Sequence, residues 1–298
     1  MKQYILSVSL GLVGLWLGAC SEDKLSDQSV IVSQRIEKTP FDKWIKAELT
    51  DPYNIRFVYR YNHNESNKNY ANVPADYLQA VKLAHILKYA CIEAYNDVAG
   101  KDFTKTYFPK LFYATGSFLY NPNNTMVLGT AEGGKKIFLA GTNSLDEYLK
   151  RREDLNHYYL QTIHHEFTHI LNQTLNYTPD FKKITGNTYL SDSWNAKNSI
   201  VGYLQRGYIS AYSQKEDRED FAELLSMYVT NTPEQWQAWM TEAGSTGAGF
   251  LAKKIEIVRN YMLKGFNIDI DKLRDDVLKR EDEIVSGKVD LTDLSIKK

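Results

Sequence analysis

The chain has 298 residues, of which 43% are hydrophobic and 24% are charged, and this composition is typical of a globular protein that buries a core without disulfides. Its formal net charge is -1 at pH 7, so there is no excess of basic side chains and nucleic acid is not an expected partner. The length allows one large domain or two smaller ones.

The first twenty residues have the pattern of a targeting segment. Lys2 supplies a positive charge, and the apolar run over residues 5–17 is too short to span a membrane. The run ends in the tetrapeptide LGAC, which resembles the lipobox of bacterial lipoproteins. That resemblance implies a signal peptide over residues 1–19 and lipid on the sulfur of Cys20. A plain secretory signal that happens to end in cysteine is the alternative.

Residues 20–40 are polar and lack periodicity, so we expect a lipidated tether followed by one domain over residues 41–298. The acidic residues directly after Cys20 resemble the surface-export signal of Bacteroidetes lipoproteins. This implies an outer-membrane lipoprotein exposed at the cell surface and attached to the membrane through its lipid alone, with a periplasm-facing position as the alternative. Cys91 is the other cysteine, and its apolar helical surroundings predict a core position.

The first half of the domain alternates between helical and extended patterns. We expect a short helix over 41–49 and a strand over 54–61. Apolar residues then recur at helical spacing until Gly100. Further strands are expected over 110–120, 126–130 and 135–140, with a turn between the last two. These elements predict an α+β fold in which a small twisted sheet lies between helices.

The second half is mostly helical. We expect a central helix over 154–175, a long irregular segment over 176–213, and a helix over 217–230. A helix from Pro233 to Met240, a flexible break over 244–249 and two charged helices from 251 onward then form a helical C-terminal subregion that begins near residue 231.

The central helix carries an H-E-x-x-H motif. His165 and His169 are four residues apart, so they lie on one helix face and can reach a single zinc ion. Glu166 is placed at the flank, where it can take a proton from a zinc-bound water. Apolar residues occupy the opposite face of the helix, which directs the two histidines toward a cleft.

A zinc site of this kind needs a third protein ligand, and a carboxylate from a second helix is expected. Glu219 and Glu223 are four apart in the helix over 217–230 and share one face with Ala222 and Ser226, whose small side chains permit a close approach. The spacing by itself leaves either glutamate as the ligand.

The combination of HHEFTH with EDFAE resembles the gluzincin metallopeptidases and is most similar to the catalytic domain of anthrax lethal factor. This resemblance implies a zincin-like fold, one Zn²⁺ ion, and Glu219 as the third ligand. It also implies that Glu223 orients a histidine. Tyr212 stands seven residues before the ligand glutamate, where the family places a tyrosine that steadies the oxyanion.

The whole chain further resembles zinc metallohydrolase lipoproteins of Bacteroidetes that occur beside outer-membrane nutrient importers. This implies hydrolysis of a peptide or protein substrate, and we place that substrate along an edge strand such as 135–140. A complex with an importer is also implied. Two alternatives stay open, namely an accessory or substrate-binding lipoprotein that holds zinc without cutting, and a structural protein with a fortuitous motif.

Overall fold

The computed structural model describes residues 37–66, 70, 72–121, 126–132 and 136–296. The chain divides into two units, 1–38 and 39–298, and the elements below belong to the second unit. The predicted signal peptide, Cys20 and the tether up to residue 36 lie outside the described residues. Within the described part of the chain, every helix is too short or too polar to cross a membrane.

The domain opens with a helical segment that ends at a left-handed residue. Thr39 caps its first turn, because its hydroxyl accepts a hydrogen bond from the backbone of Asp42 and the Asp42 carboxylate bonds back to the Thr39 backbone. Asn54 ends it with a φ of 57°. The segment therefore runs further than the predicted 41–49. It comprises α2 (Pro40–Ile45), η1 (Lys46–Thr50) and α3 (Asp51–Tyr53).

A long and largely buried helix follows β1 (Arg56–Val58) in the chain, and it confirms the helix that the apolar spacing predicts up to Gly100. Asp76 accepts hydrogen bonds from two backbone N–H groups of its first turn, and Gly100 ends it with a φ of 84°. Cys91 is fully buried within it, as predicted. The helix comprises α4 (Tyr77–Ile86), η2 (Leu87–Ile92) and α5 (Glu93–Ala99), and α6 (Lys101–Tyr107) comes next.

The predicted sheet is present, with shorter strands than expected. It contains β1 (Arg56–Val58), β2 (Leu111–Ala114), β5 (Gly129–Glu132) and β6 (Lys136–Leu139), in the order β1-β2-β6-β5. The first three strands in that order are parallel, and β5 is antiparallel to β6. β3 (Leu119–Tyr120) and β4 (Met126–Val127) form a separate pair. The expectation that 135–140 is an edge strand is wrong, because β6 lies between β2 and β5.

The remaining elements are helices and short helical turns. The predicted central helix is α8 (Arg152–Leu155), η4 (Asn156–Leu160) and α9 (Gln161–Thr174) in succession, preceded by α7 (Leu145–Tyr148). The irregular segment contains α10 (Asp180–Thr185) and the turns η6 (Leu204–Arg206) and η7 (Tyr212–Gln214). The chain then forms α11 (Asp217–Thr230), as predicted, followed by α12 (Pro233–Phe266) and α13 (Ile270–Val285).

The predicted break over 244–249 is present but narrower than expected, because α12 consists of two helices that meet at a kink. Only Gly244 departs from helical geometry, with a φ of 66°. At Gly247, an added Cβ would lie 2.2 Å from the carbonyl oxygen of Leu204, so glycine lets α12 approach η6 closely. The glycines therefore serve one kink at Gly244, which divides α12 into two helices, and one close contact in the second of these helices.

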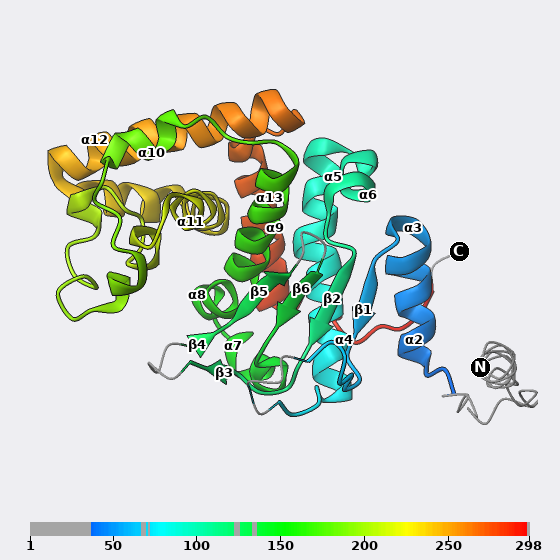
Figure 1. Cartoon of the computed structure of the whole chain (residues 1–298). Helices are drawn as coiled ribbons and strands as arrows, with labels where there is room; N and C mark the ends of the chain where they lie inside the picture. The colour runs from blue at the N-terminus through cyan, green and yellow to red at the C-terminus, as the bar shows by residue number, and fades with distance from the viewer. Residues whose placement is uncertain (1–36, 67–69, 71, 122–125, 133–135, 297–298) are drawn as a thin grey trace, which may run out of the picture. The chain divides into compact units, whose positions relative to one another are not determined.

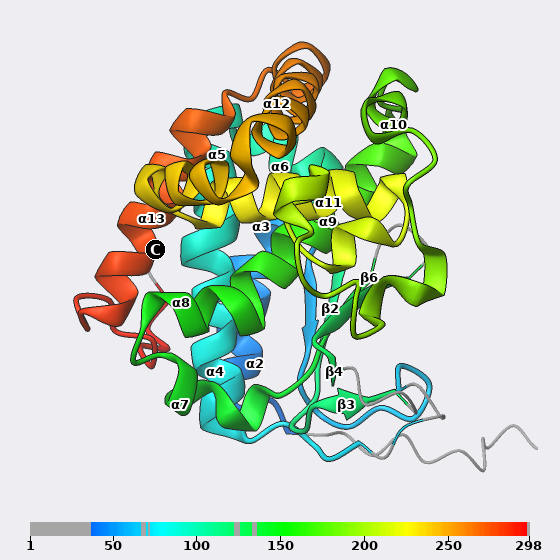
Figure 2. The same ribbon diagram turned by 90° about the vertical axis from the view of Figure 1, so that its left-hand side faces the viewer.

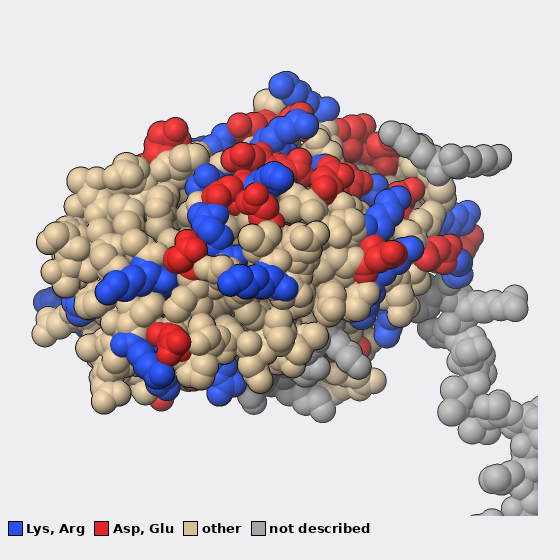
Figure 3. Space-filling model, turned by 90° about the horizontal axis from the view of Figure 1, so that it is seen from above, with Lys and Arg blue, Asp and Glu red and all other residues tan. Residues whose placement is uncertain are grey.

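The helix α9 lies at the centre of the second unit. It packs against β5 and β6 on one side and against α11 on another, while α11 also contacts α12 and α13 (Figures 1 and 2). The fold is α+β, as predicted. On the face seen in Figure 3, basic and acidic side chains are interspersed, so that face carries no extended field of one sign.

Candidate metal centre

Two histidines of α9 point away from the core. Ile163, Phe167 and Leu171 on the same helix are at most 1% exposed and pack into the core cluster, which fixes the rotation of the helix. His165 and His169 consequently emerge together on the other face, with their ring centroids 4.7 Å apart. The helix thus holds a pair of imidazoles in place through its buried side.

The helix α11 brings two glutamates to this pair. The two helices pack against each other, and Ala222 and Ser226 of α11 are fully buried. Glu219 and Glu223 are both buried and both face His165. They contact different atoms of that ring, because Glu219 lies beside Nε2 and Glu223 beside Nδ1.

Three atoms at this site form a nearly regular triangle. The Nε2 atoms of His165 and His169 and Oε2 of Glu219 lie 3.1 Å from one another. Hydrogen bonds cannot account for all three contacts, because the carboxylate oxygen has no proton and each Nε2 carries at most one. Three ligands of a tetrahedral zinc ion, at about 2.0–2.1 Å from it, lie roughly 3.3 Å apart. Both the donor set and the spacing fit zinc.

The electrostatics of the site also favour a bound cation. Burial opposes a charge on His165, but its contacts with the carboxylates of Glu219 and Glu223 outweigh burial and raise the pKa of the ring to about 10. Burial likewise opposes the charge of Glu219, and the two imidazoles outweigh it and lower the pKa of that carboxyl well below its usual range. Without metal, the carboxylates thus draw a proton onto His165, and a divalent cation supplies the same positive charge.

Glu223 is placed to orient His165. Its Oε1 lies 2.9 Å from Nδ1 of His165, in ion-pair contact although the N–H direction departs from that of an aligned hydrogen bond. Its Oε2 accepts a hydrogen bond of 2.7 Å from the hydroxyl of Ser210. A carboxylate on the far nitrogen of a metal-binding histidine keeps Nε2 free and aimed at the metal.

Tyr212 contacts the carboxylate of Glu219. Its hydroxyl donates a hydrogen bond of 2.9 Å to Oε1, the oxygen that faces away from the imidazoles. Burial and the nearby carboxylates raise the pKa of Tyr212 well above its ordinary value, so the hydroxyl keeps its proton. Lys215 donates to the same oxygen at 3.1 Å, and the ring of Trp194 packs edge-on against Tyr212.

A cleft of about 730 Å³ opens beside the triangle. His169 and Glu219 line this cleft, together with residues from the end of α9, from the segment that leads into α10 and from the start of α11. Glu166 is half-buried and directly follows His165, and its charge contributes to the raised pKa values of both His165 and Tyr212. The arrangement joins an acceptor for protons, a metal position and a space for substrate.

The structure brings together all six residues that the sequence analysis assigned to the site within the described chain, and it adds two. Lys215 stands four residues before Glu219, so its spacing to that residue was a usable signal. Ser210 had no signal, because its contact with Glu223 depends on how the irregular segment folds. His164 is buried beside Tyr95, with its Nδ1 3.1 Å from the hydroxyl, and burial lowers the pKa of this histidine to about 4.

Comparisons with known proteins agree with this geometry. Residues 34–271 match the family described as "putative zinc-binding metallo-peptidase". A crystal structure of a protein described in the same words, from Bacteroides caccae, is 34% identical, with a TM-score of 0.74, and the alignment covers 90% of this chain and 100% of that one. No curated protein matches the chain. The match over most of its length shows that this chain belongs to the family of zinc-binding metallopeptidases.

Proposed function

We propose that the protein hydrolyses peptide bonds as a gluzincin-type enzyme, with one zinc ion held by His165, His169 and Glu219. The observation that carries this proposal is the 3.1 Å triangle of donor atoms, two of whose residues, His169 and Glu219, line a cleft. A site that only stored or displayed zinc would have no use for Glu166, which directly follows the first histidine ligand.

The chain's own residues supply proton transfer and orientation. When bound, zinc supplies Lewis-acid chemistry, which polarises a carbonyl group and makes water more acidic. Glu166 accepts the proton of the attacking water and passes it to the leaving amine. Glu223 holds His165 in the orientation that the ligand role requires. Tyr212 keeps its proton at neutral pH and can donate it in a hydrogen bond to the developing oxyanion.

The outer edge of β5, which pairs with no further strand among the described residues, is the position that we propose for an extended substrate. β5 is the outer strand of the sheet on the side of α9, and it packs directly on that helix. At Gly129 an added Cβ would lie 2.4 Å from Cγ2 of Thr162, so glycine allows strand and helix to approach closely. A peptide that pairs with this edge gains main-chain hydrogen bonds close to the active-site helix.

We also propose that the enzyme works as an outer-membrane lipoprotein at the cell surface, attached through lipid on Cys20 and acting beside a nutrient importer. The support is the LGAC ending of the apolar run and the acidic residues that follow it. Several acyl chains together give stable attachment, at roughly 0.8 kcal/mol for each buried methylene. Metabolic labelling with a fatty-acid analogue tests this, and label that persists in a Cys20→Ala variant would refute it.

The catalytic proposal is tested with a Glu166→Gln variant. The variant keeps both imidazoles and Glu219, so it should bind zinc like the parent, while its kcat/KM on a peptide library should fall about 10²–10⁴-fold because the proton acceptor is gone. Zinc content by atomic absorption and cleavage by mass spectrometry measure the two outcomes.

A Glu219→Ala variant serves as the control for the metal, since it should lose both zinc and cleavage. Cleavage that persists in Glu166→Gln would remove Glu166 from its role. A parent protein that binds zinc and cuts no peptide in the library would favour the accessory, substrate-binding alternative.

A further inference from the structure

One oxygen of Glu219 receives two donors. Its Oε2 faces the two imidazoles, and its Oε1 accepts hydrogen bonds from the Tyr212 hydroxyl at 2.9 Å and from the Lys215 ammonium at 3.1 Å. These donors also contact each other, because Nζ of Lys215 donates to the Tyr212 oxygen at 3.3 Å and lies 5.2 Å from the centre of the Tyr212 ring. The two donors thus share one acceptor, whose two lone pairs take both hydrogen bonds.

This arrangement conflicts with the role proposed for Tyr212. A phenol has a single proton, and in this structure that proton is directed at Oε1 of Glu219. Tyr212 can donate to a substrate oxyanion only after it leaves Oε1. If nothing else held that buried oxygen, its departure would leave a carboxylate oxygen without a donor, which is costly away from water.

We propose that Lys215 is a positioning residue that keeps Oε1 of Glu219 occupied while Tyr212 turns to the substrate. This inference rests on the proposed function. An ammonium group has three protons, so Lys215 can hold Oε1 without giving up its other contacts. With Oε1 held, only Oε2 is directed at the imidazole pair, and the carboxylate does not rotate to offer both oxygens to the metal.

The surroundings of Lys215 distinguish it from an ordinary surface lysine. Its side chain is 30% exposed and that of Glu219 12% exposed, so the pair is partly shielded from water. In the described part of the chain, no other Lys or Arg forms an ion pair with Glu166, Glu219 or Glu223. Lys215 lies between Tyr212 and the start of α11 at Asp217. From there its ammonium group contacts both the Tyr212 hydroxyl and the Glu219 carboxylate.

The proposal is tested with Lys215→Met, Tyr212→Phe and the double variant, in zinc-loaded full-length protein. With Lys215→Met, Tyr212 stays committed to Oε1, so kcat should fall about as far as in Tyr212→Phe, roughly 10²-fold, with KM unchanged. The double variant should be no slower than either single variant. Lys215→Arg keeps a donor to Oε1 and should restore kcat to within a few-fold of the parent.

Zinc affinity gives a second readout that needs no turnover. Each single variant leaves one donor on Oε1, so affinity measured against a chelating dye should change by less than about 10-fold, whereas the double variant should lose roughly 10–100-fold. Lys183→Met, which removes an exposed lysine paired with Asp180, is the matched control and should change neither quantity.

Two results would overturn the role of Lys215. One is a kcat for the double variant that equals the product of the two single effects, which would show that the residues act independently. The other is a double variant with parental zinc affinity, which would show that Oε1 needs no donor. If the parent cuts no peptide, the proposed function fails, and the affinity series still decides whether Lys215 holds Glu219.

Discussion

At the scale of single residues, Glu219 and Glu223 show how position gives the same side chain two tasks. Glu219 reaches the Nε2 atoms of both histidines, and Glu223 reaches Nδ1 of His165 together with the hydroxyl of Ser210. In the proposed function the metal lies where the two imidazoles converge, which makes Glu219 the proposed ligand and Glu223 its proposed support. One helical turn separates the two tasks.

Asp42 provides a prediction at the same scale. Burial alone would raise its pKa, but paired hydrogen bonds from Arg60 and further bonds from Thr39 outweigh burial and lower the pKa to about 2. The folded-state pKa lies below the unfolded value of about 3.9, so the stabilisation is complete above about pH 4 and is lost as the pH falls toward 2. Asp42→Asn should cost about 1–2 kcal/mol at pH 7, after allowance for partial exposure.

Urea unfolding of the two proteins at several pH values measures this difference. The gap between parent and variant should narrow as the pH is lowered from 5 toward 2. A gap that stays constant over that range would show that the ion pair with Arg60 contributes nothing to stability.

At the scale of elements, a buried ion pair fastens α11 to α12. Asp220 and Lys254 are both fully buried, with Nζ 2.6 Å from Oδ2. Lys254 also donates to the carbonyl oxygen of Gly207, and the hydroxyl of Tyr189 donates to Asp220. Asp220 directly follows the proposed zinc ligand Glu219. The pair therefore ties the helix that carries the ligand to the longest helix of the domain.

Removing one partner of this ion pair should strongly lower the stability of the folded protein. Lys254→Met leaves a buried carboxylate without its cation and should lower the free energy of unfolding by about 3–5 kcal/mol, whereas adding Asp220→Asn should recover part of the loss. Chemical denaturation measures both. The neighbouring Lys253 is exposed, and Lys253→Met should have little effect. Equal losses in Lys254→Met and Lys253→Met would contradict the role of the pair.

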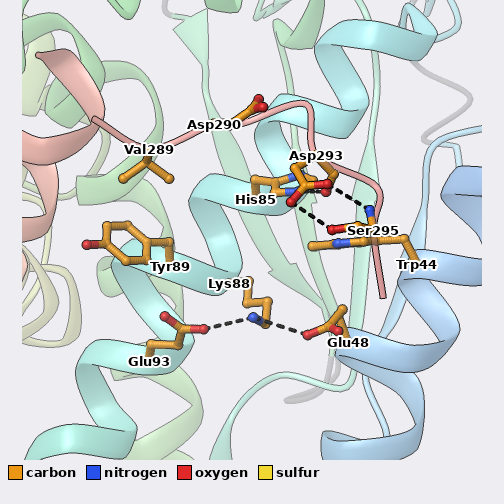
Figure 4. A pocket seen from close by; sticks show the side chains of 10 residues that line it. All are labelled: Trp44, Glu48, His85, Lys88, Tyr89, Glu93, Val289, Asp290, Asp293 and Ser295. Carbon is orange, nitrogen blue, oxygen red and sulfur yellow. Dashed lines mark hydrogen bonds and ion pairs between the residues drawn. The ribbon is translucent and has the colours of Figure 1, made fainter. Parts of the chain in front are cut away.

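At the scale of the whole second unit, the chain after α13 returns to the N-terminal helices. His85 on α4 stacks on Trp44 of α2, with ring centroids 4.2 Å apart, and its Nε2 lies 2.9 Å from the carbonyl oxygen of Asp293. These residues line a pocket of about 390 Å³ (Figure 4), and none of its lining residues belongs to the cleft beside the metal centre. The segment around Asp293 thus packs against α2 and α4, away from the cleft beside the metal centre.

We expect His85→Ala to release the C-terminal segment without disturbing the metal centre. Loss of the hydrogen bonds and the stacked ring should cost about 1–3 kcal/mol, and amide exchange over 288–296 should speed up. Zinc affinity should remain that of the parent. His157→Ala, which removes an exposed histidine, is the control. Unchanged exchange over 288–296 in His85→Ala would show that other contacts hold the segment.

The sequence by itself determined the local features. Apolar spacing predicts the helices that became α9 and α11, and the interval between His165 and His169 predicts a shared face, because both follow from the geometry of a single helix. The glycines of 244–249 predict a break, and Gly244 provides it, but the sequence does not separate Gly244 from Gly247, which permits close packing inside the following helix. The strand order likewise had no local signal, so β6 was wrongly expected at an edge.

Only the tertiary structure decided which carboxylate meets the histidines. Glu219 and Glu223 share one helix face, so the spacing left either as the ligand, and the choice depends on how far α11 is shifted along α9. That shift is set by the packing of buried side chains between segments about fifty residues apart in the chain, which the spacing within one helix does not contain. The contacts of Ser210 and Lys215 with the two glutamates exist only once this packing is in place.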